Sequence, residues 1–388
     1  MLGAGWMGRR ALLLVEGSRG RRIMATVLAA LMPEPRAPVE VRELSEPELE
    51  PNSALMEVAL SEVCGTDVYL QQGRLAGVPY PLIPGHVSVG RLSKIRGRLL
   101  DVTGEPFAEG DRVTFLDVHR TCNACWQCLV AKATTRCPRR KVYGITYGLA
   151  DGLTGGWAQK IYLKPDTRCI RLGEVDFEKF MAGGCALPTA LHAVERAGVA
   201  LGDTVLVLGS GPVGLSAIIF ALMSGALKVL CIGAPENRLE AARKAGASAT
   251  LNVETSDEEM RGQWVLEQTQ GRGADVTIEA TGAPVAVAQA MRFTRDAGRV
   301  CIVGQYTDHG EISFNPHLDL NRKHLDVRGC WGSDFSHFYR GAQIMADPLR
   351  SKAWAQIKLD RYNLGQANEA LADVATGKIV KALIAPQA

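Results

Sequence analysis

Residues 24 to about 172 show short apolar runs that Gly and Pro interrupt. The clearest runs are Ala54–Val63, Val87–Ile95, Asp111–Val118 and Ala158–Leu163. Short runs bounded by turn residues are typical of β-strands that are joined by long loops. The pattern therefore predicts a first region that consists mainly of β-structure.

The pattern changes near Cys185. The apolar segments that follow are short and rich in β-branched residues: Thr204–Leu208, Val229–Ile232, Val276–Glu279 and Val300–Val303. Helix-like stretches lie between several of them, including Leu215–Met223 and Asn237–Ala245. Strands that are buried on both faces and alternate with helices predict an α/β fold with a doubly wound parallel sheet. After about Asp326 the pattern is mixed again, and a last strand is expected at Ile379–Ile384.

The first strand of this second region runs into a glycine-rich turn. The stretch Thr204–Gly214 reads TVLVLGSGPVG, with the three glycines of a dinucleotide-binding turn at Gly209, Gly211 and Gly214. The first glycine permits the tight turn, the second lets the backbone approach a pyrophosphate, and the third lets the helix pack on the strand. The pyrophosphate would then meet the free N–H groups at the start of the helix, where Pro212 and Val213 stand.

The end of the second strand bears on the choice between NAD(H) and NADP(H). An acidic residue at that place usually binds the ribose hydroxyls, but this chain has Gly233 there, with Arg238 following. No carboxylate would repel a 2′-phosphate, and Arg238 could bind one, so NADP(H) is slightly favoured over NAD(H). The alternative is that Gly233 is only a turn residue and that Arg238 is a solvated helix charge.

Four of the ten cysteines crowd into one short segment. Two residues separate each of the first three and eight separate the last two, in the order Cys122, Cys125, Cys128 and Cys137. Four thiolates on one loop can close a tetrahedral shell around zinc and leave no position for a substrate. The spacing therefore predicts a structural zinc site and not a set of disulfides.

The formal charge of +3 comes from the first residues of the chain. Residues 1–23 hold five arginines and one glutamate, which exceeds the net charge of the whole sequence, so no nucleic-acid-binding face is indicated. We interpret this segment as a disordered extension, or as sequence that precedes a translation start at Met24. Its apolar run Ala11–Val15 is too short for a secretory signal, and no stretch approaches the roughly 20 apolar residues of a membrane helix. We expect a cytoplasmic protein without nucleic-acid or membrane partners.

Further candidates for metal binding are dispersed, and each taken singly has an ordinary explanation as a buried residue. Their order along the chain is what indicates a shared function. The following segments occur in this order along the chain: Cys64-Gly65-Thr66-Asp67, Gly85-His86, Gly110-Asp111-Arg112-Val113, the four-cysteine loop, Cys185 with Thr189, and the glycine turn. From about Met24 to its end, the chain resembles the zinc-containing medium-chain alcohol dehydrogenase family, which includes sorbitol and threonine dehydrogenases.

This resemblance implies a GroES-like β domain that both ends of the chain form, residues 24–186 and 328–388, around a Rossmann domain at 187–327. It implies a catalytic zinc ion held by Cys64, His86 and Cys185, beside the structural one. It also implies roles for single residues: Asp67 would orient His86, Thr66 would accept the alcohol proton, Thr189 would lie beside the nicotinamide, and Lys381 would contact the pyrophosphate. The expected partner is a small alcohol or carbonyl substrate, and the expected assembly is a homodimer or homotetramer.

Two positions depart from the family pattern. The family usually has Glu after the zinc-binding histidine, where this chain has Val87, and commonly has His at the outer end of the proton relay, where this chain has Tyr69. A phenol can pass a proton on but is a poor base near neutral pH. These changes motivate one alternative, a reductase of C=N or conjugated C=C bonds. A second alternative is a non-enzymatic zinc or nucleotide-binding protein, against which the intact Cys64, Thr66, His86 and Cys185 argue.

Overall fold

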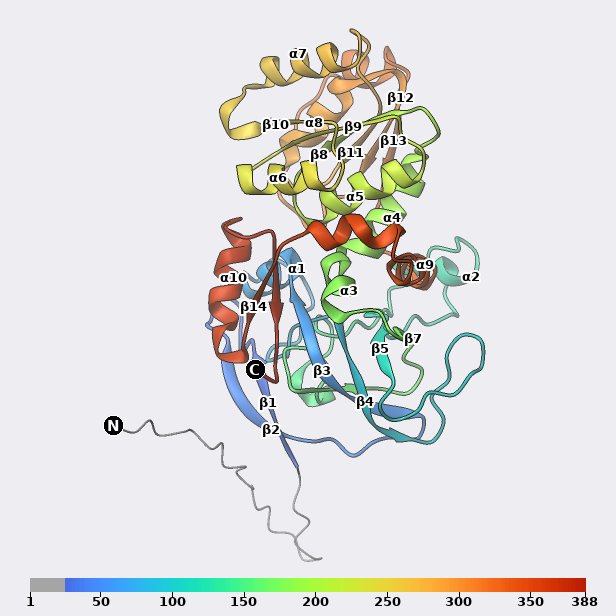
Figure 1. Ribbon diagram of the computed structural model, residues 1–388, viewed down its shortest axis with the longest axis vertical. Helices are drawn as coiled ribbons and strands as arrows, with labels where there is room; N and C mark the ends of the chain where they lie inside the picture. Colours follow the sequence, from blue (N-terminus) through green and yellow to red (C-terminus); the bar gives the residue numbers. More distant parts are fainter. Residues whose placement is uncertain (1–24) are drawn as a thin grey trace, which may run out of the picture.

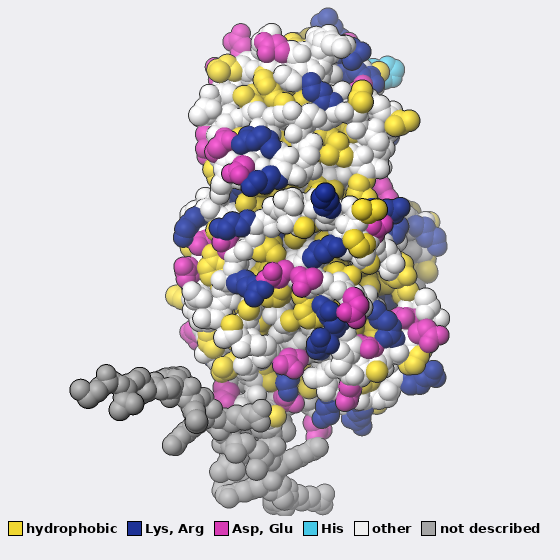
Figure 2. Space-filling model, in the orientation of Figure 1, with side chains coloured by type: hydrophobic (Ala, Val, Ile, Leu, Met, Phe, Trp, Pro, Cys, Tyr) yellow, Lys and Arg dark blue, Asp and Glu magenta, His cyan; other side chains and the backbone are white. Residues whose placement is uncertain are grey.

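Two sheets organise the chain, one in the lower and one in the upper half of Figure 1. The computed structural model describes residues 25–388, so the expectations for residues 1–23 lie outside the described residues. Figure 2 shows basic and acidic side chains interspersed over the face in view. Within residues 25–388, no helix is long and apolar enough to cross a membrane.

The lower sheet has the order β14-β15-β3-β4-β5-β7, and β6 also pairs with β3. Its strands come from both ends of the chain: β3 (Ser53–Val63), β4 (Ser88–Arg96), β5 (Arg112–Phe115), β6 (Lys160–Leu163), β7 (Cys169–Arg171), β14 (Leu359–Tyr362) and β15 (Lys381–Ile384). The last strand, β15, runs antiparallel to β3. A separate antiparallel pair consists of β1 (Thr26–Leu31) and β2 (Glu40–Ser45).

The upper sheet is parallel throughout and has the order β10-β9-β8-β11-β12-β13. Its strands are β8 (Thr204–Leu208), β9 (Lys228–Gly233), β10 (Ala249–Asn252), β11 (Ala274–Glu279), β12 (Thr294–Ile302) and β13 (Asp326–Gly329). Counted along the chain, this is the order 3-2-1-4-5-6 of a dinucleotide-binding Rossmann sheet. The predicted fold class, a doubly wound parallel sheet beside a β domain, is confirmed.

Helices lie beside both sheets. They are α1 (Gly65–Gln71), α2 (Trp126–Leu129), α3 (Phe177–Gly183), α4 (Ala186–Ala197), α5 (Pro212–Met223), α6 (Glu236–Lys244), α7 (Glu258–Gln268), α8 (Pro284–Phe293), α9 (Phe335–Ala346) and α10 (Ala367–Ala375). Of these, α5 to α8 belong to the upper half of Figure 1, and α1, α2, α3 and α10 belong to the lower half. Proline in the first turn of α5 and α8 has the fixed φ that a helix start needs. In α7, the side chain of Asp257 accepts a hydrogen bond from the N–H of Met260 and caps the helix.

The two halves share one apolar core. Leu187 and Ala190 of α4 are fully buried in the same cluster as Val89 of β4 and Val207 of β8. Cys185, one of the three predicted metal ligands, stands at the start of α4, so this helix fixes the position of that residue relative to the upper sheet.

The structure also adds elements that the sequence pattern did not predict. The strand β13 runs from Asp326 to Gly329, past the expected end of the Rossmann domain at residue 327. Three of its four residues are exposed, because it is an edge strand, and so it lacks the continuous apolar run on which the prediction relied.

Candidate metal centres and cofactor cleft

Three separate segments bring Cys64, His86 and Cys185 together. Cys64 follows β3 and caps α1, His86 precedes β4, and Cys185 caps α4. Their ligand atoms all lie within 4.8 Å of one another, and Cys64 Sγ is 3.9 Å from His86 Nε2. A hydrogen bond with Cys185, together with the neighbouring His86, lowers the pKa of Cys64 well below its ordinary value despite its burial. Two sulfurs and one imidazole fit a zinc site that keeps one position open.

Asp67, for which the family resemblance implies a role in orienting His86, lies near the imidazole of that histidine. Its Oδ2 accepts a hydrogen bond of 2.8 Å from the N–H of Cys64, which places the carboxylate against the cluster. Its Oδ1 is 4.0 Å from His86 Nδ1, and both of these buried atoms lack a hydrogen-bond partner within residues 25–388. Asp67 therefore faces the imidazole at ion-pair distance without a hydrogen bond to it.

Glu62 is a buried carboxylate beside the cluster that sequence reasoning missed. Its Oε2 accepts a hydrogen bond of 2.7 Å from the N–H of Cys185, and its Oε1 lies 3.3 Å from Cys185 Sγ. Lys381 donates to the same Oε1 at 2.7 Å and to the carbonyl of Gly183 at 3.1 Å. The ammonium group of Lys381 is thus bound on the metal side of the cleft and would have to leave Glu62 to reach a pyrophosphate.

The cluster lies in a cleft of about 320 Å³ between the two sheets. Most residues with a predicted role at the substrate or cofactor line it: Cys64, Thr66, Tyr69, His86, Cys185, Thr189, Gly211, Pro212, Val213, Arg238 and Lys381. Gly209, Gly214 and Gly233 are not among the residues that line it. The predicted site is therefore one continuous cavity with the metal-binding cluster and the glycine turn in the same space.

The glycine turn has the close contacts that the motif requires. Gly209 has a φ of +110°, and a Cβ on Gly214 would lie 1.9 Å from the carbonyl oxygen of Gly209. Gly211 caps α5 and lines the cleft, and a Cβ on it would meet no atom within 4 Å. The backbone conformation and close contacts therefore explain the glycines at 209 and 214, whereas position 211 leaves open space at the start of the helix.

Gly233 is the last residue of β9, as expected. A Cβ there would lie 2.4 Å from Ser210 Oγ, so an acidic side chain would not fit beside the glycine turn without a shift of Ser210. Arg238 lines the cleft but donates from Nη2 to the carbonyl of Ile379 at 3.1 Å. Its role at a 2′-phosphate stays a prediction.

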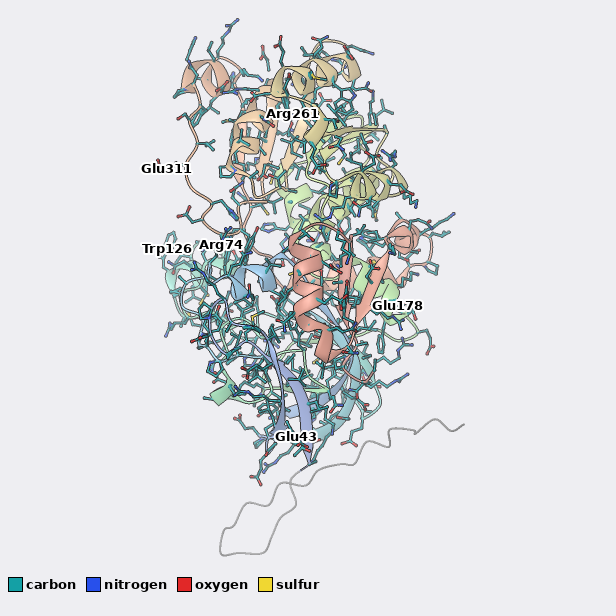
Figure 3. All side chains as sticks on the ribbon, turned by 90° about the vertical axis from the view of Figure 1, so that its left-hand side faces the viewer. Glu43, Arg74, Trp126, Glu178, Arg261 and Glu311 are labelled. Carbon is teal, nitrogen blue, oxygen red and sulfur yellow. The ribbon has the colours of Figure 1, made fainter. Side chains whose placement is uncertain are left out.

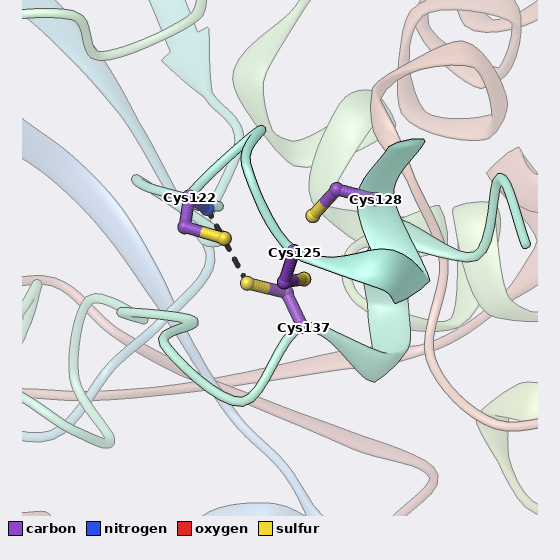
Figure 4. A group of neighbouring side chains, drawn as sticks. All are labelled: Cys122, Cys125, Cys128 and Cys137. Atoms are coloured by element: carbon purple, nitrogen blue, oxygen red, sulfur yellow. Dashed lines mark hydrogen bonds between the residues drawn. The ribbon is translucent and has the colours of Figure 1, made fainter. Parts of the chain in front are cut away.

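The four-cysteine loop gathers its sulfur atoms as the spacing predicts. The Sγ atoms of Cys122, Cys125, Cys128 and Cys137 lie within 4.8 Å of one another (Figure 4). The N–H of Cys122 donates to Cys137 Sγ at 3.3 Å, and the N–H of Ala124 is the main cause that lowers the pKa of Cys122 to about 6. A closed set of four sulfurs fits a structural zinc ion.

This loop also contributes to the wall of the cleft. The guanidinium groups of Arg136 and Arg140 stack on the ring of Trp331 at 4.3 and 4.8 Å, and Trp331 stacks on Tyr306 with ring centroids 5.5 Å apart. Arg140, Tyr306 and Trp331 line the cleft. Three other aromatic side chains do not line the cleft: Tyr143 and His337 are buried elsewhere, and Trp126 is 64% exposed on α2.

Comparisons with known proteins agree with this geometry. The family profile "Alcohol dehydrogenase GroES-like domain" matches residues 50–174, and "Zinc-binding dehydrogenase" matches residues 212–347. The 5-exo-hydroxycamphor dehydrogenase of Pseudomonas putida is 32% identical, over 86% of this chain and 92% of that protein. The erythritol/L-threitol dehydrogenase of Mycolicibacterium smegmatis is 30% identical, over 79% of this chain and 85% of that protein.

Solved structures give the same result. The alcohol dehydrogenase of Thermotoga maritima has a TM-score of 0.87 and 31% identity, over 93% of this chain and 99% of that one. A zinc-binding dehydrogenase of Sinorhizobium meliloti, solved with NADP bound, has a TM-score of 0.81 and 25% identity, over 93% and 100% of the two chains. The chain belongs to the zinc-containing medium-chain dehydrogenase family.

As a member of this family, the chain is an oxidoreductase of the zinc-dependent, NAD(P)-dependent alcohol dehydrogenase type. Neither the C=N and C=C reductase nor the non-enzymatic alternative is favoured. Family membership also gives meaning to Glu62. Val87 stands where the family usually has Glu after the zinc-binding histidine. The N–H of Glu62 donates to the carbonyl of Val87 at 3.0 Å. The side chain of Glu62 therefore places a carboxylate beside the cluster from the neighbouring strand.

Proposed function

We propose that this dehydrogenase interconverts a small alcohol and its aldehyde or ketone, with a catalytic zinc ion held by Cys64, His86 and Cys185. The observation that carries the proposal is the convergence of these three donors, within 4.8 Å of one another, in the same cleft as the glycine turn. A hydride can pass between substrate and cofactor only if both reacting carbons meet in one water-poor space. The same cleft is lined by these three donors and by Gly211, Pro212 and Val213 at the start of α5.

In this mechanism the chain binds, orients and moves a proton. Zinc would supply Lewis-acid polarisation of the substrate oxygen. Thr66 would take the alcohol proton, since its hydroxyl lines the cleft two residues after Cys64. Asp67 would hold the imidazole of His86 in place, and Thr189 would contact the nicotinamide. The N–H groups at the start of α5 would bind the pyrophosphate.

We further propose a second, structural zinc ion in the four-cysteine loop, bound by Cys122, Cys125, Cys128 and Cys137. We also propose a slight preference for NADP(H), supported by the missing carboxylate at Gly233 and by the NADP-bound neighbour from Sinorhizobium meliloti. A homodimer or homotetramer, which rests on the family resemblance, is the proposed assembly.

The test is oxidation of a panel of cyclic and linear alcohols by the purified enzyme with each cofactor. We expect NAD(P)H formation that is lost when a chelator removes zinc and returns when zinc is added. A hydride transfer that survives complete removal of metal from the enzyme would contradict the proposal.

A further inference from the structure

Two opposite charges line the cleft without a charged partner. Apart from the proposed zinc ligands, the charged side chains that line it are Asp117, Arg140, Arg238 and Lys381. Lys381 is paired with Glu62, and Arg238 donates to a backbone carbonyl. Within residues 25–388, the Asp117 carboxylate has no hydrogen bond or ion pair, and Arg140 has no acidic partner. A few polar groups placed in a cleft usually orient and select its ligand, so these two charges bear on the substrate.

The guanidinium of Arg140 is held in place and still has free donors. It stacks on Trp331, with Cζ 4.8 Å from the ring centroid, and its Nη1 donates to the carbonyl of Thr135 at 3.1 Å. Stacking occupies the flat side of the group and leaves the N–H groups along its edge for hydrogen bonds in the plane. Among the described residues, Nε and Nη2 of Arg140 have no acceptor. The fixed group can therefore bind a planar anion.

The wall that carries Arg140 is built from both halves of the molecule. Trp331 follows β13, and its ring lies on that of Tyr306, from the loop after β12, with an interplanar angle of 6°. Trp331 Nε1 also donates to the carbonyl of Tyr306 at 2.9 Å. Figure 3 shows Trp126 of the four-cysteine loop and Glu311 of the loop after β12 on the same side of the molecule as Arg74, which follows α1. Arg140 is thus fixed where the two halves meet.

The charges of Arg140 and Asp117 both act on the phenol of Tyr306. Burial is the main cause that raises the pKa of Tyr306 to about 12, Arg140 and the hydroxyl of Thr66 oppose the rise, and Asp117 adds to it. Thr66 is the residue proposed to take the alcohol proton, two positions after Cys64. The unpaired guanidinium and carboxylate therefore lie near the substrate end of the cleft.

We propose that Arg140 selects the substrate, and that the substrate is a hydroxy acid whose carboxylate binds the free edge of this guanidinium. This inference rests on the proposed function. A carboxylate and a guanidinium match in a pair of parallel, charge-assisted hydrogen bonds. During oxidation, the hydride passes with its electron pair from the hydroxyl-bearing carbon to NAD(P)⁺, and the hydroxyl proton is released. The carboxylate is unchanged, so the product is an oxo acid and NAD(P)H.

Asp117 limits the charge that the substrate can carry. With both side chains ionised, Asp117 and Arg140 together add no net charge to this end of the cleft. A doubly charged phosphate would meet one guanidinium and lie near a carboxylate of the same sign, which repels it. A single carboxylate can bind Arg140 while Asp117 accepts a hydrogen bond from a further hydroxyl of the substrate. We therefore expect singly charged, polar hydroxy acids and not phosphorylated alcohols.

The test compares hydroxy acids with their methyl esters in the zinc-loaded full-length enzyme. The probes are lactate, 3-hydroxybutanoate and 4-hydroxybutanoate, each beside its ester, together with glycerol 3-phosphate. A charge-assisted hydrogen bond contributes a factor of roughly ten to a hundred, so kcat/KM for the best acid should exceed that for its ester by this factor. Arg140→Gln should lower the ratio to about one. The loss should appear chiefly as a higher KM for the acid, because the ground state and the transition state share the contact.

The matched control is Arg139→Gln, which removes the same charge one residue away. Arg139 is exposed and does not line the cleft, so this variant should keep the wild-type ratio. Arg140→Lys keeps the charge but loses the planar fork, and its ratio should be intermediate. Esters that are oxidised as well as every acid, an acid preference that survives in Arg140→Gln, or a preference for glycerol 3-phosphate over every acid would overturn the proposal.

A binding measurement needs no turnover. Calorimetric titration of the zinc-loaded enzyme with NAD(P)H bound uses butanoate, which has no hydroxyl group, and butanamide, which has no charge. The Kd of butanoate should rise by about tenfold or more in Arg140→Gln and stay unchanged in Arg139→Gln, and butanamide should not distinguish the variants. Equal butanoate affinity in wild type and Arg140→Gln would overturn the contact. If the wild-type enzyme oxidises no alcohol, ester or acid, the proposed function fails; if it oxidises neutral alcohols without preferring acids, only this inference fails.

Discussion

Lys381 Nζ lies 2.7 Å from Glu62 Oε1, and both side chains are 1% exposed. The pair joins β15 to β3 and so ties the end of the chain to the strand that leads into Cys64. Because Glu62 also accepts from the N–H of Cys185, this one carboxylate connects a proposed zinc ligand to the last strand.

Replacing Lys381 by Met should destabilise the protein strongly. The change leaves the Glu62 carboxylate buried without its partner, and breaking a buried pair in this way costs about 3–5 kcal/mol. The matched control is Lys378→Met, since Lys378 is 65% exposed beside Asp373 and an exposed ion pair contributes little to the free energy of unfolding. Urea unfolding of both variants measures the difference. Equal losses in the free energy of unfolding would show that the buried pair stabilises the protein no more than the exposed one.

The sequence predicts those features whose signal is local. Thr204–Gly214 is both strand pattern and glycine turn, and Cys122–Cys137 is one loop, so the fold class and the four-sulfur cluster follow from spacing alone. Glu62 and Lys381 are 319 residues apart, and each in isolation is an ordinary charged residue. The edge-to-face contact of Tyr69 with His309 likewise depends on how the loop after β12 packs on α1. Local pattern holds no information about such pairs.

Replacing Cys125 by Ser should chiefly destabilise the four-cysteine loop. A closed structural zinc site contributes folding free energy, so metal analysis should find one zinc ion fewer per chain. Since Arg136 and Arg140 stack on Trp331 in the cleft wall, the substrate KM should also rise. Cys169→Ser is the control, because Cys169 is a buried cysteine outside both clusters. Loss of the same zinc in the control would contradict the assignment.

Replacing Arg238 by Gln should reduce the preference for NADP(H) over NAD(H). A charge-assisted hydrogen bond to a 2′-phosphate contributes about 1.5–3 kcal/mol, a factor of roughly ten to a hundred. Asn237→Ala controls for lost packing, because Asn237 also bonds to the C-terminal segment, at the carbonyl of Lys378. The ratio of kcat/KM for the two cofactors measures the effect. A ratio that is unchanged in Arg238→Gln would show that the guanidinium does not reach the cofactor.

Asp334 should make the stability of α9 depend on pH. The hydrogen bond from His337 is the main cause that lowers the pKa of Asp334 below its model-peptide value of 3.8, and Asp334 caps α9 through the N–H of Ser336. A lowered folded-state pKa gives stability that is present above pH 3.8 and is lost as the pH falls toward the folded-state pKa. Asp334→Ala should therefore cost about 1 kcal/mol at pH 7 and less at pH 3.5. Thermal unfolding at the two pH values tests this, and a cost that does not fall with pH would contradict it.

The central claim is that Cys64, His86 and Cys185 hold a zinc ion on which hydride transfer depends. The most direct measurement is zinc content and alcohol oxidation in the same preparations of the wild-type enzyme and of Cys64→Ser. We predict two zinc ions per wild-type chain. The variant should keep one zinc ion, the fold and cofactor binding, but no turnover. A Cys64→Ser variant that turns over at the wild-type rate, or an active wild-type enzyme whose only zinc ion lies in the four-cysteine loop, would contradict the account.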